Sequence, residues 1–414
     1  MHRAKTTKAH LGSPSDEAND AAAQDALPPS RTVVMIVANI KQFRFAFYEQ
    51  IEKELRSTGI RLHVVYSASA PSEQSKGDSR DLPEPLGVKT PRSYWLKERI
   101  LFQYLPISLL WRADLVIMVQ SNGYMSNLAL HLARLMGWRR LAYWGHGYNH
   151  QGDASSAAEK IKRRLACHVD WWFTYTHQTG KYLQQLGFPG NKTTVIENAV
   201  DTSLFGNEVT NAPPALQTAL KSRLQIPEDA CVGMFCGSLY ADKQLAFLLD
   251  VARQIHLEQP NFRLIIIGDG PQRQWLLNSI VDQNWIHYAG AQFGRDKAIY
   301  FSISDFFLNP GLVGLAILDS FAAGLPFITS QYPGHSPEIA YLEHQVNGLM
   351  LPFDRQVYAQ SVLDLIRNPA RLSQLRTGAL MSARRYTVEN MVSNVANGIR
   401  QFLQSRLVNS GVNG

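Results

Sequence analysis

Short apolar runs alternate with helical patterns along the chain. In the first half the runs are Val33–Val37, Leu62–Tyr66, Leu115–Val119, Leu141–Tyr143, Trp171–Thr174 and Thr194–Ile196. Each run is short and mainly apolar, which is typical of a strand buried on both faces of a sheet. Amphipathic segments such as Phe45–Leu55 lie between several of the runs. The pattern predicts a parallel sheet with helices on both faces.

The alternation stops once and then restarts. Phe205–Pro227 carries glycine, asparagine and proline residues, so we expect an interdomain linker there. Helices are expected beyond it at about 244–256, 271–281, 315–323 and 355–367. The strands predicted between them are Val232–Phe235, Leu264–Ile267, Ile286–Tyr288, Phe306–Leu308 and Phe327–Thr329. This half therefore predicts a second doubly wound, Rossmann-like α/β unit.

A chain of 414 residues is longer than a single core usually supports. We predict an N-terminal domain over 31–208 and a C-terminal domain over 228–386, facing each other across a central cleft. A last helix over 388–407 should pack back on the N-terminal domain. Residues 1–30 lack the apolar stretch of a signal peptide and are expected to form a disordered tail.

The N-terminal half is basic, which changes the range of expected partners. Residues 1–200 hold 25 Lys and Arg against 17 Asp and Glu, while the rest of the chain is close to neutral. Nucleic acid, an acidic membrane surface and a phosphate-bearing substrate would each fit this charge. The chain shows no zinc-finger or RNP pattern, which argues against nucleic acid. Three cysteines form no disulfide framework and indicate a reducing, cytoplasmic location.

The most informative segment runs from Asn309 to Ser320. It leaves a predicted strand through Gly311 and Gly314 and then enters a helix. A helix N-terminus offers unpaired N–H groups and partial positive charge, and glycines let an anion approach the backbone. Asp319, one turn into the helix, could accept hydrogen bonds from both hydroxyls of a ribose. An acidic residue favoured there only by the helix dipole is the alternative.

This segment resembles the donor motif of family 4 glycosyltransferases. In that family two glutamates separated by seven residues frame a glycine-rich loop, roughly E-G-F-G-L-x-x-L-E-A-x-A-x-G-x-P. The second glutamate is Asp319 here and the first is Gly311, which is a departure from the pattern. The resemblance implies the GT-B architecture and a donor diphosphate held by the loop Gly311, Leu312, Val313, Gly314 and Leu315.

Other segments match the same family in order and spacing. Gly237–Lys243 is similar to a G-R-L-x-x-x-K loop, with Ser238 in place of the family arginine. The resemblance implies that Gly237, Ser238 and Lys243 contact the donor, with the lysine as a point charge. Three further matches are Gly268–Pro271 with G-x-G-P, Asn198–Thr202 with N-G-V-D-x, and Pro337–Ile339 with P-E-I.

The N-terminal domain carries weaker signals. His146 lies between two glycines after a predicted strand, and the resemblance implies a catalytic role beside the donor sugar, with a structural histidine as the alternative. Lys41 and Arg44 fill the first strand–helix loop and could bind an anionic acceptor, or they could simply be exposed. Tyr94–Leu105 interleaves aromatic and basic residues, which fits either a core-facing helix or a membrane-interface segment.

The resemblance implies a retaining, hexosyltransferase-like enzyme that moves a sugar from a nucleotide-diphosphate donor to a glycan or lipid-linked acceptor, in surface-polysaccharide biosynthesis. A nucleotide-sugar epimerase or hydrolase on the same fold is one alternative. A non-catalytic, nucleotide-sugar-binding pseudoenzyme is another, suggested by Gly311 and Ser238. No Asp-x-Asp motif or His/Cys cluster is present, so we expect a metal-independent site without a further cofactor. Peripheral contact with the inner face of a membrane is expected as an alternative to a purely cytoplasmic enzyme.

Overall fold

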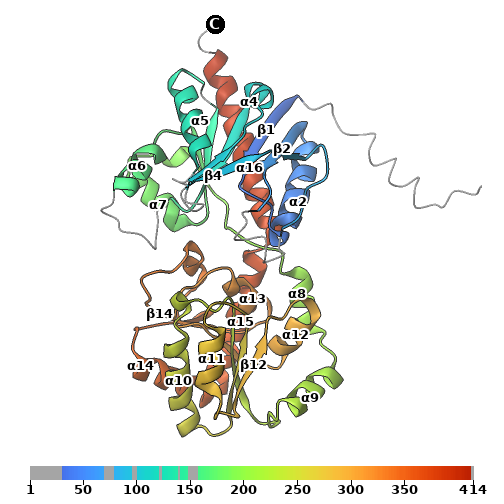
Figure 1. Ribbon diagram of the computed structural model, residues 1–414, viewed down its shortest axis with the longest axis vertical. Coiled ribbons are helices and arrows are strands. Elements are labelled where there is room, and N and C mark those ends of the chain that lie inside the picture. The colour runs from blue at the N-terminus through green and yellow to red at the C-terminus, as the bar shows by residue number, and fades with distance from the viewer. Residues whose placement is uncertain are drawn as a thin grey trace, which may run out of the picture.

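A computed structural model describes residues 30–69, 79–95, 100–120, 124–138, 140–147 and 157–411, without the side chains of 157–159, 162 and 407–411. The tail predicted over 1–30 therefore lies almost wholly outside the described residues. Figure 1 shows two lobes stacked along the long axis, each with a central sheet flanked by helices.

The upper lobe contains a seven-stranded parallel sheet in the order β3-β2-β1-β6-β7-β8-β9. Its strands are β1 (Arg31–Ile36), β2 (Ile60–Tyr66), β3 (Gly87–Lys89), β6 (Leu115–Val119), β7 (Leu141–Gly145), β8 (Trp171–Thr174) and β9 (Thr193–Val195). The predicted strands of this half are confirmed to within a residue or two. Its helices are α2 (Phe45–Arg56), α4 (Ile107–Arg112), α5 (Met125–Leu135), α6 (Ala157–Ala166) and α7 (His177–Gln185).

The lower lobe contains a six-stranded parallel sheet in the order β12-β11-β10-β13-β14-β15. Its strands are β10 (Cys231–Cys236), β11 (Phe262–Ile267), β12 (Ile286–Gly290), β13 (Phe306–Leu308), β14 (Phe327–Ser330) and β15 (Gly348–Leu351). Its helices are α8 (Ser203–Thr210), α9 (Pro214–Arg223), α10 (Leu245–Glu258), α11 (Arg273–Ile280), α12 (Gly294–Ser302), α13 (Ala316–Ala322), α14 (Arg355–Ile366) and α15 (Pro369–Arg385).

Alternation along the strands explains why both faces of each sheet are covered. In β1, Val33 and Met35 join one apolar cluster with helices α2 and α16 (Val388–Gly411), whereas Val34 and Ile36 join another with α4, α5 and α7. Neighbouring residues of a strand point to opposite faces, so uniformly apolar strands need two apolar layers. The predicted fold class, two doubly wound α/β domains, is confirmed in this arrangement.

Helix α16 returns from the lower lobe to the upper one. It packs along α2 and against β8 and β9, and Arg400 Nη2 lies 2.6 Å from Glu54 Oε1. Figure 1 shows it in red, running up through the blue and green N-terminal elements. The chain thus crosses between the lobes twice, after β9 and before α16.

Two local expectations were wrong. Phe205–Pro227 is not an irregular linker, because α8 and α9 occupy most of it and pack against α12. Pro214 stands in the first turn of α9, where a missing N–H costs nothing, and Gly206 meets the backbone of Ala322 closely. The helical reading of Tyr94–Leu105 was also wrong, since β4 (Arg92–Trp95) and β5 (Ile100–Gln103) form an antiparallel hairpin.

Candidate functional site

The candidate donor site lies at the carboxyl ends of β10 and β13. The strand order of the lower sheet reverses between these two neighbours, which is where open α/β sheets bind ligands. The loop after β10 ends in the short helix η3 (Ala241–Lys243), and Leu312 N donates to Asp242 O at 2.8 Å. The structure therefore brings together the two loops that the sequence singled out.

The side chain of Lys243 connects these two loops through a hydrogen bond. Its Nζ donates to Leu312 O at 2.5 Å, and burial lowers the pKa of the ammonium to about 8. Desolvation disfavours the charged form of a lysine, whereas a bound anion would favour it. Above pH of about 8 this lysine is largely neutral, and a bound diphosphate would favour its regaining a proton.

Gly311 has a different role from the one inferred from sequence. A Cβ at this position would lie 2.2 Å from Asp242 O and 2.5 Å from the carbonyl carbon of Lys243. The space beside Gly311 is thus filled by the backbone of η3 and is closed to an anion. At Gly314 the nearest atom to such a Cβ is Ser336 Oγ at 4.0 Å, so only this glycine leaves open space. With this backbone packing, no side chain, a glutamate included, fits at position 311.

The loop before α13 presents unpaired amides. Val313 N donates to the ring of the buried His335 at 3.1 Å, which fixes the loop from below. Among the described residues, the N–H groups of Gly314 and Leu315 have no hydrogen-bond partner. These donors belong to the loop whose Leu312 carbonyl accepts from Lys243 Nζ, and a lysine beside open amides is an arrangement suited to a diphosphate.

Asp319 is held by a lysine that the sequence reasoning missed. Lys297 Nζ on α12 lies 2.7 Å from Asp319 Oδ2 on α13. Both groups and Lys243 act on the Cys236 thiol at the end of β10, where burial raises the thiol pKa to about 12. One signal was available: Lys297 shares a helical face with Phe301, which is buried, and a lysine on a core-facing position needs a counter-ion.

The remaining predicted donor residues lie on the same edge. Ser238 is exposed directly after Gly237, and Leu239 N donates to Asp269 O at 3.0 Å. Gly268 approaches the backbone of Gly237 so closely that a Cβ would lie 1.9 Å from Gly237 O. The G-x-G-P turn therefore has a structural role, because it packs against the backbone of the donor loop.

In the upper lobe, His146 follows β7 and is exposed. Gly147 after it has φ of 74°, and its carbonyl accepts from Gln120 Nε2 at 3.2 Å. The imidazole lies 5.5 Å, between ring centroids, from the Tyr175 ring. The histidine thus stands on a fixed backbone at the carboxyl end of the upper sheet. The neighbouring His150 lies outside the described residues.

Arg44 and Lys41, predicted as a pair of acceptor contacts, have different partners in the structure. The Arg44 guanidinium donates to Ala199 O at 2.7 Å and to Asn198 Oδ1, both at the crossing between the lobes. Arg44 therefore has a structural role, and its contact with an acceptor stays a prediction. Lys41 pairs with Ser79 through an isolated bridge beside a polar cavity of about 350 Å³. The Ser67 hydroxyl lines this cavity, is buried and has no partner among the described residues.

The crossing itself is a hydrogen-bonded unit. Asn198 Nδ2 donates to Glu338 Oε1 at 2.6 Å, and Tyr341 Oη donates to Asn198 O at 2.9 Å. Both partners belong to η4 (Pro337–Tyr341) of the lower lobe. Asn198 thereby ties the Arg44 side chain of the upper lobe to the P-E-I segment.

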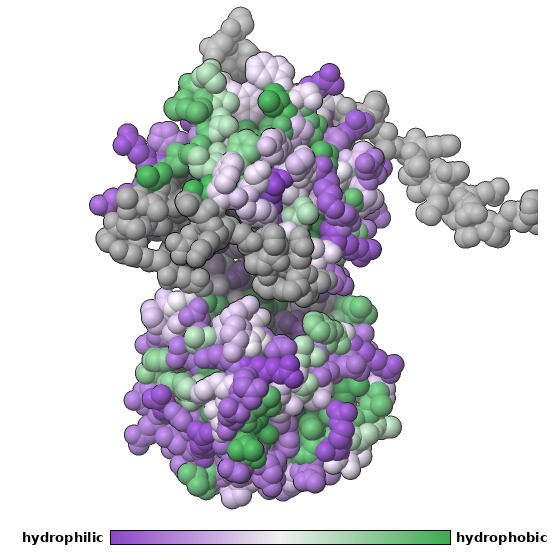
Figure 2. All heavy atoms as spheres, viewed as in Figure 1, coloured by the Kyte–Doolittle hydropathy of each residue, from purple (hydrophilic) through white to green (hydrophobic). Residues whose placement is uncertain are grey.

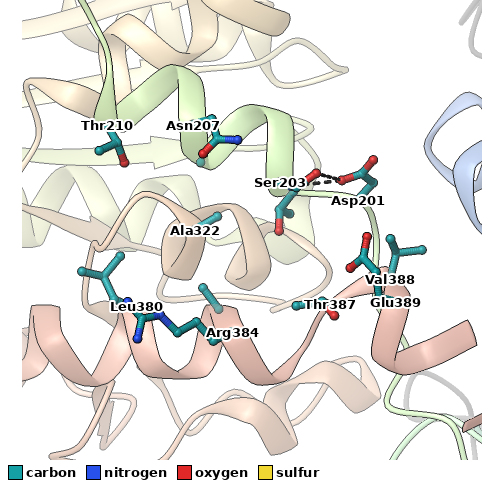
Figure 3. A pocket seen from close by; sticks show the side chains of 13 residues that line it. Asp201, Ser203, Asn207, Thr210, Ala322, Leu380, Arg384, Thr387, Val388 and Glu389 are labelled. Carbon is teal, nitrogen blue, oxygen red and sulfur yellow. Dashed lines mark hydrogen bonds between the residues drawn. The ribbon is translucent and has the colours of Figure 1, made fainter. Parts of the chain in front are cut away.

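A second cavity, of about 370 Å³, lies behind this crossing and away from the candidate donor site. Figure 3 shows it between α8, the end of α13 and α15, with Asp201 bonded to Ser203 at its rim. Leu380 and Ala322 form an apolar floor, and Arg384 and Glu389 stand at the edge. None of the predicted site residues lines it.

Two features bear on metals and membranes. Within the described residues, no three His, Cys, Asp or Glu side chains gather as a metal site requires. None of the helices in the described part of the chain has the length and apolar character that crossing a membrane requires.

Comparison with known proteins matches two family models, one to each lobe. The model described as Glycosyl transferases group 1 matches residues 230–368, and the one described as Glycosyltransferase Family 4 matches residues 47–204. The alpha-monoglucosyldiacylglycerol synthase of Acholeplasma laidlawii is 27% identical over 178 residues, 41% of this chain and 44% of the relative. The D-inositol 3-phosphate glycosyltransferase of Thermobispora bispora is 25% identical over 214 residues, 48% of each protein.

The chain thus matches about half the length of these curated relatives. Among solved structures, Anabaena HepE in complex with UDP is similar, with a TM-score of 0.64 and 15% identity over 89% of this chain and 99% of that one. A likeness at this identity concerns the fold, and it confirms the expected GT-B architecture.

Proposed function

We propose, from the premise that this chain belongs to the family 4, or group 1, glycosyltransferases, that it moves a sugar from a nucleotide-diphosphate donor to a glycan or lipid-linked acceptor. The observation that carries the donor half is that Lys243 is hydrogen-bonded to Leu312 O in the same loop that leaves the N–H groups of Gly314 and Leu315 open. A buried lysine and preorganised N–H groups stabilise charge as it develops on a leaving diphosphate.

The donor would lie across the carboxyl ends of β10 and β13. Its diphosphate would contact Lys243 and the loop from Gly314, and its ribose would contact Asp319. Charge on the diphosphate is then balanced by protein groups, so the reaction is proposed to be metal-independent. Several structures of HepE, with UDP and with UDP-glucose, support a nucleotide-sugar donor for this fold.

The acceptor would bind on the basic upper lobe. The names of the two relatives contain a diacylglycerol product and an inositol 3-phosphate, which supports a lipid or phosphate-bearing acceptor. Two contacts are proposed on this side. One is the polar cavity beside Lys41, and the other is His146 at the end of β7. Retention of anomeric configuration, a role in surface-polysaccharide biosynthesis and a cytoplasmic location with peripheral membrane contact belong to the same proposal.

One observation favours a second candidate function. Position 311 is closed to any side chain, so the carboxylate that the family places beside the donor sugar has no counterpart there. A nucleotide-sugar-binding pseudoenzyme would tolerate this change. Release of nucleoside diphosphate on addition of an acceptor separates the two, because only the transferase turns over.

The proposal is tested by thermal shift against a panel of nucleotide sugars, followed by titration calorimetry with the matching nucleoside diphosphates. We expect saturable binding of at least one diphosphate and a shift with its sugar conjugate. Absence of binding to every nucleotide at millimolar concentration would overturn the donor site, and with it the proposed function.

A further inference from the structure

Helix α5 exposes apolar side chains to solvent and buries several polar ones, the reverse of an ordinary surface helix. Its polar side chains point inward: Asn127 Nδ2 donates to Val119 O at 3.0 Å, and His131 Nε2 lies 2.6 Å from Tyr143 Oη. Its exposed side chains are all apolar: Met125, Leu128, Ala129, Leu132 and Leu135. A water-facing helix normally shows the opposite pattern, so this face is built for a partner other than water.

Neighbouring residues extend the apolar face. Leu132, Leu135 and Met136 are 61%, 69% and 83% exposed. Ile107 and Trp111 of α4 are 76% and 74% exposed, and Leu110 of α4 shares a buried cluster with Leu130 of α5. We call Met125, Leu128, Leu132, Leu135 and Met136, with Ile107 and Trp111, the α5 face. Figure 2 shows apolar residues gathered in green over this part of the upper lobe.

The surroundings of the α5 face are basic. Helices α4, α5 and α6 carry six Lys or Arg residues, of which Arg134 pairs with Asp170, and a single acidic one, Glu159. Arg112 at the end of α4 and Lys160 and Arg164 on α6 are exposed. Apolar side chains framed by cations are the chemistry that binds an anionic lipid interface.

We propose that the α5 face docks the enzyme on an anionic lipid bilayer surface. A second copy of the chain fits less well, because an isologous dimer pairs the same patch on both subunits and would bring two basic surroundings together. The face begins at Met125, soon after the carboxyl end of β6, and follows α5 back toward the amino ends of the parallel strands. A bilayer along it would therefore reach the edge of the lobe where the acceptor is expected.

The α5 face is the contact surface through which the enzyme would reach its acceptor, and this role rests on the proposed function. It also replaces the contact predicted from the sequence. The predicted segment Tyr94–Leu105 is a hairpin, and its residues Lys97 and Arg99 lie outside the described part of the chain. The α5 face instead combines exposure with apolar side chains.

Cosedimentation of the full chain with phosphatidylcholine vesicles, with and without phosphatidylglycerol, tests the proposal. We expect binding to the anionic vesicles that weakens as salt rises, because attraction between exposed charges fades within a Debye length. The double variant Leu132→Ser, Leu135→Ser should lose about tenfold or more in vesicle affinity. Both side chains point to solvent, so the fold should survive, which nucleoside diphosphate binding will check.

A matched control is Leu257→Ser on α10, since Leu257 is 81% exposed on the other lobe. It should leave vesicle binding unchanged. Full vesicle binding by the double variant would overturn the proposal. So would sedimentation velocity showing a dimer that the double variant dissociates, since a second copy would then cover the face. Loss of nucleotide binding in the wild type would instead count against the proposed function, independently of the vesicles.

Discussion

Lys297 Nζ and Asp319 Oδ2 lie 2.7 Å apart and join helix α12 to helix α13 beneath the candidate donor loop. Both side chains are largely shielded, and the ammonium also lies 4.5 Å from the centroid of the Phe205 ring. A pair in such surroundings keeps its geometry better than an exposed one. Lys297 thereby fixes the carboxylate that we assign to the donor ribose.

Replacement of Asp319 by Ala should weaken nucleoside diphosphate binding by about 1.5–3 kcal/mol, the usual cost of losing a hydrogen bond to a charged group. Glu338→Ala, at the crossing between the lobes, should weaken binding less. Titration calorimetry on both variants, after a check of folding by circular dichroism, gives the comparison. Unchanged affinity in a folded Asp319→Ala protein would contradict the ribose assignment. Lys297→Met, which keeps the carboxylate, should bind better than Asp319→Ala.

Restoring the family glutamate at position 311 should harm this protein. A Cβ there would lie 2.2 Å from Asp242 O, so Gly311→Glu must displace η3 and with it Lys243. We expect a loss of about 1–3 kcal/mol in unfolding free energy and a clear loss of nucleotide affinity. Gly314→Ala is the control, because the space beside Gly314 is open and stability should change little. Denaturant unfolding and calorimetry measure both; a stable, tightly binding Gly311→Glu variant would refute the packing argument.

The strands, the fold class and the donor loops could be predicted because their signals are local. An apolar run ends, a glycine or proline turn follows, and a helix begins, as between Phe306 and Ala316. That Lys243 and the loop from Gly311 serve one site was implied by the family resemblance, and the hydrogen bond from Lys243 Nζ to Leu312 O places them side by side.

What could not be predicted depends on contacts between distant segments. The role of Arg44 requires that Asn198 come beside it, 154 positions away in the chain. The clash that excludes a side chain at 311 depends on the backbone path of η3. Helix α8 was missed because Gly206 reads as a breaker, although it gives the close approach to Ala322 that packs α8 against α13.

Chelators should leave turnover intact. The predicted donor site balances charge with Lys243 and backbone amides, and no metal cluster is found among the described residues. Initial rates of diphosphate release, measured with and without EDTA, should agree within about twofold. A complete loss of rate in EDTA that a divalent ion restores would contradict a metal-independent site.

Nucleotide binding should take up a proton above pH of about 8. Burial lowers the pKa of Lys243 to about 8, and a diphosphate favours its charged form. Affinity should therefore fall as pH rises through this value. The stability of the apo protein should change in the opposite direction. Between pH of about 8 and 10.5, Lys243 is protonated in the unfolded chain but largely neutral in the folded one, so its contribution to the free energy of unfolding rises with pH.

Calorimetry in two buffers of different ionisation enthalpy measures this proton uptake directly. Lys243→Met should abolish it and lower affinity, whereas Lys192→Met, at an exposed position in the upper lobe, should change neither. Binding enthalpy that is independent of the buffer above pH of about 8 would show that Lys243 does not meet the diphosphate.

The crossing between the lobes should respond to acid through Glu338. Burial raises the pKa of this carboxyl, and the hydrogen bond from Asn198 Nδ2 at 2.6 Å only partly offsets that cost. A carboxyl whose pKa is raised in the folded state binds more protons there than in the unfolded chain. Its contribution to stability therefore grows as pH falls toward the raised pKa and is lost as pH rises through it.

Glu338→Gln keeps an acceptor for Asn198 but cannot titrate. We expect the wild type to gain stability relative to this variant as pH falls through the raised pKa of Glu338 toward 4.5, the ordinary value of a glutamate, measured by urea unfolding at each pH. Glu338→Ala should instead lose about 1–3 kcal/mol at every pH, because it leaves the Nδ2 donor of the buried Asn198 without its acceptor. A difference between wild type and Glu338→Gln that stays constant with pH would mean that the Glu338 carboxyl keeps one protonation state across the window. The tie between Arg44, Asn198 and Glu338 would then be insensitive to acid, and the crossing would hold the two lobes equally well at either pH.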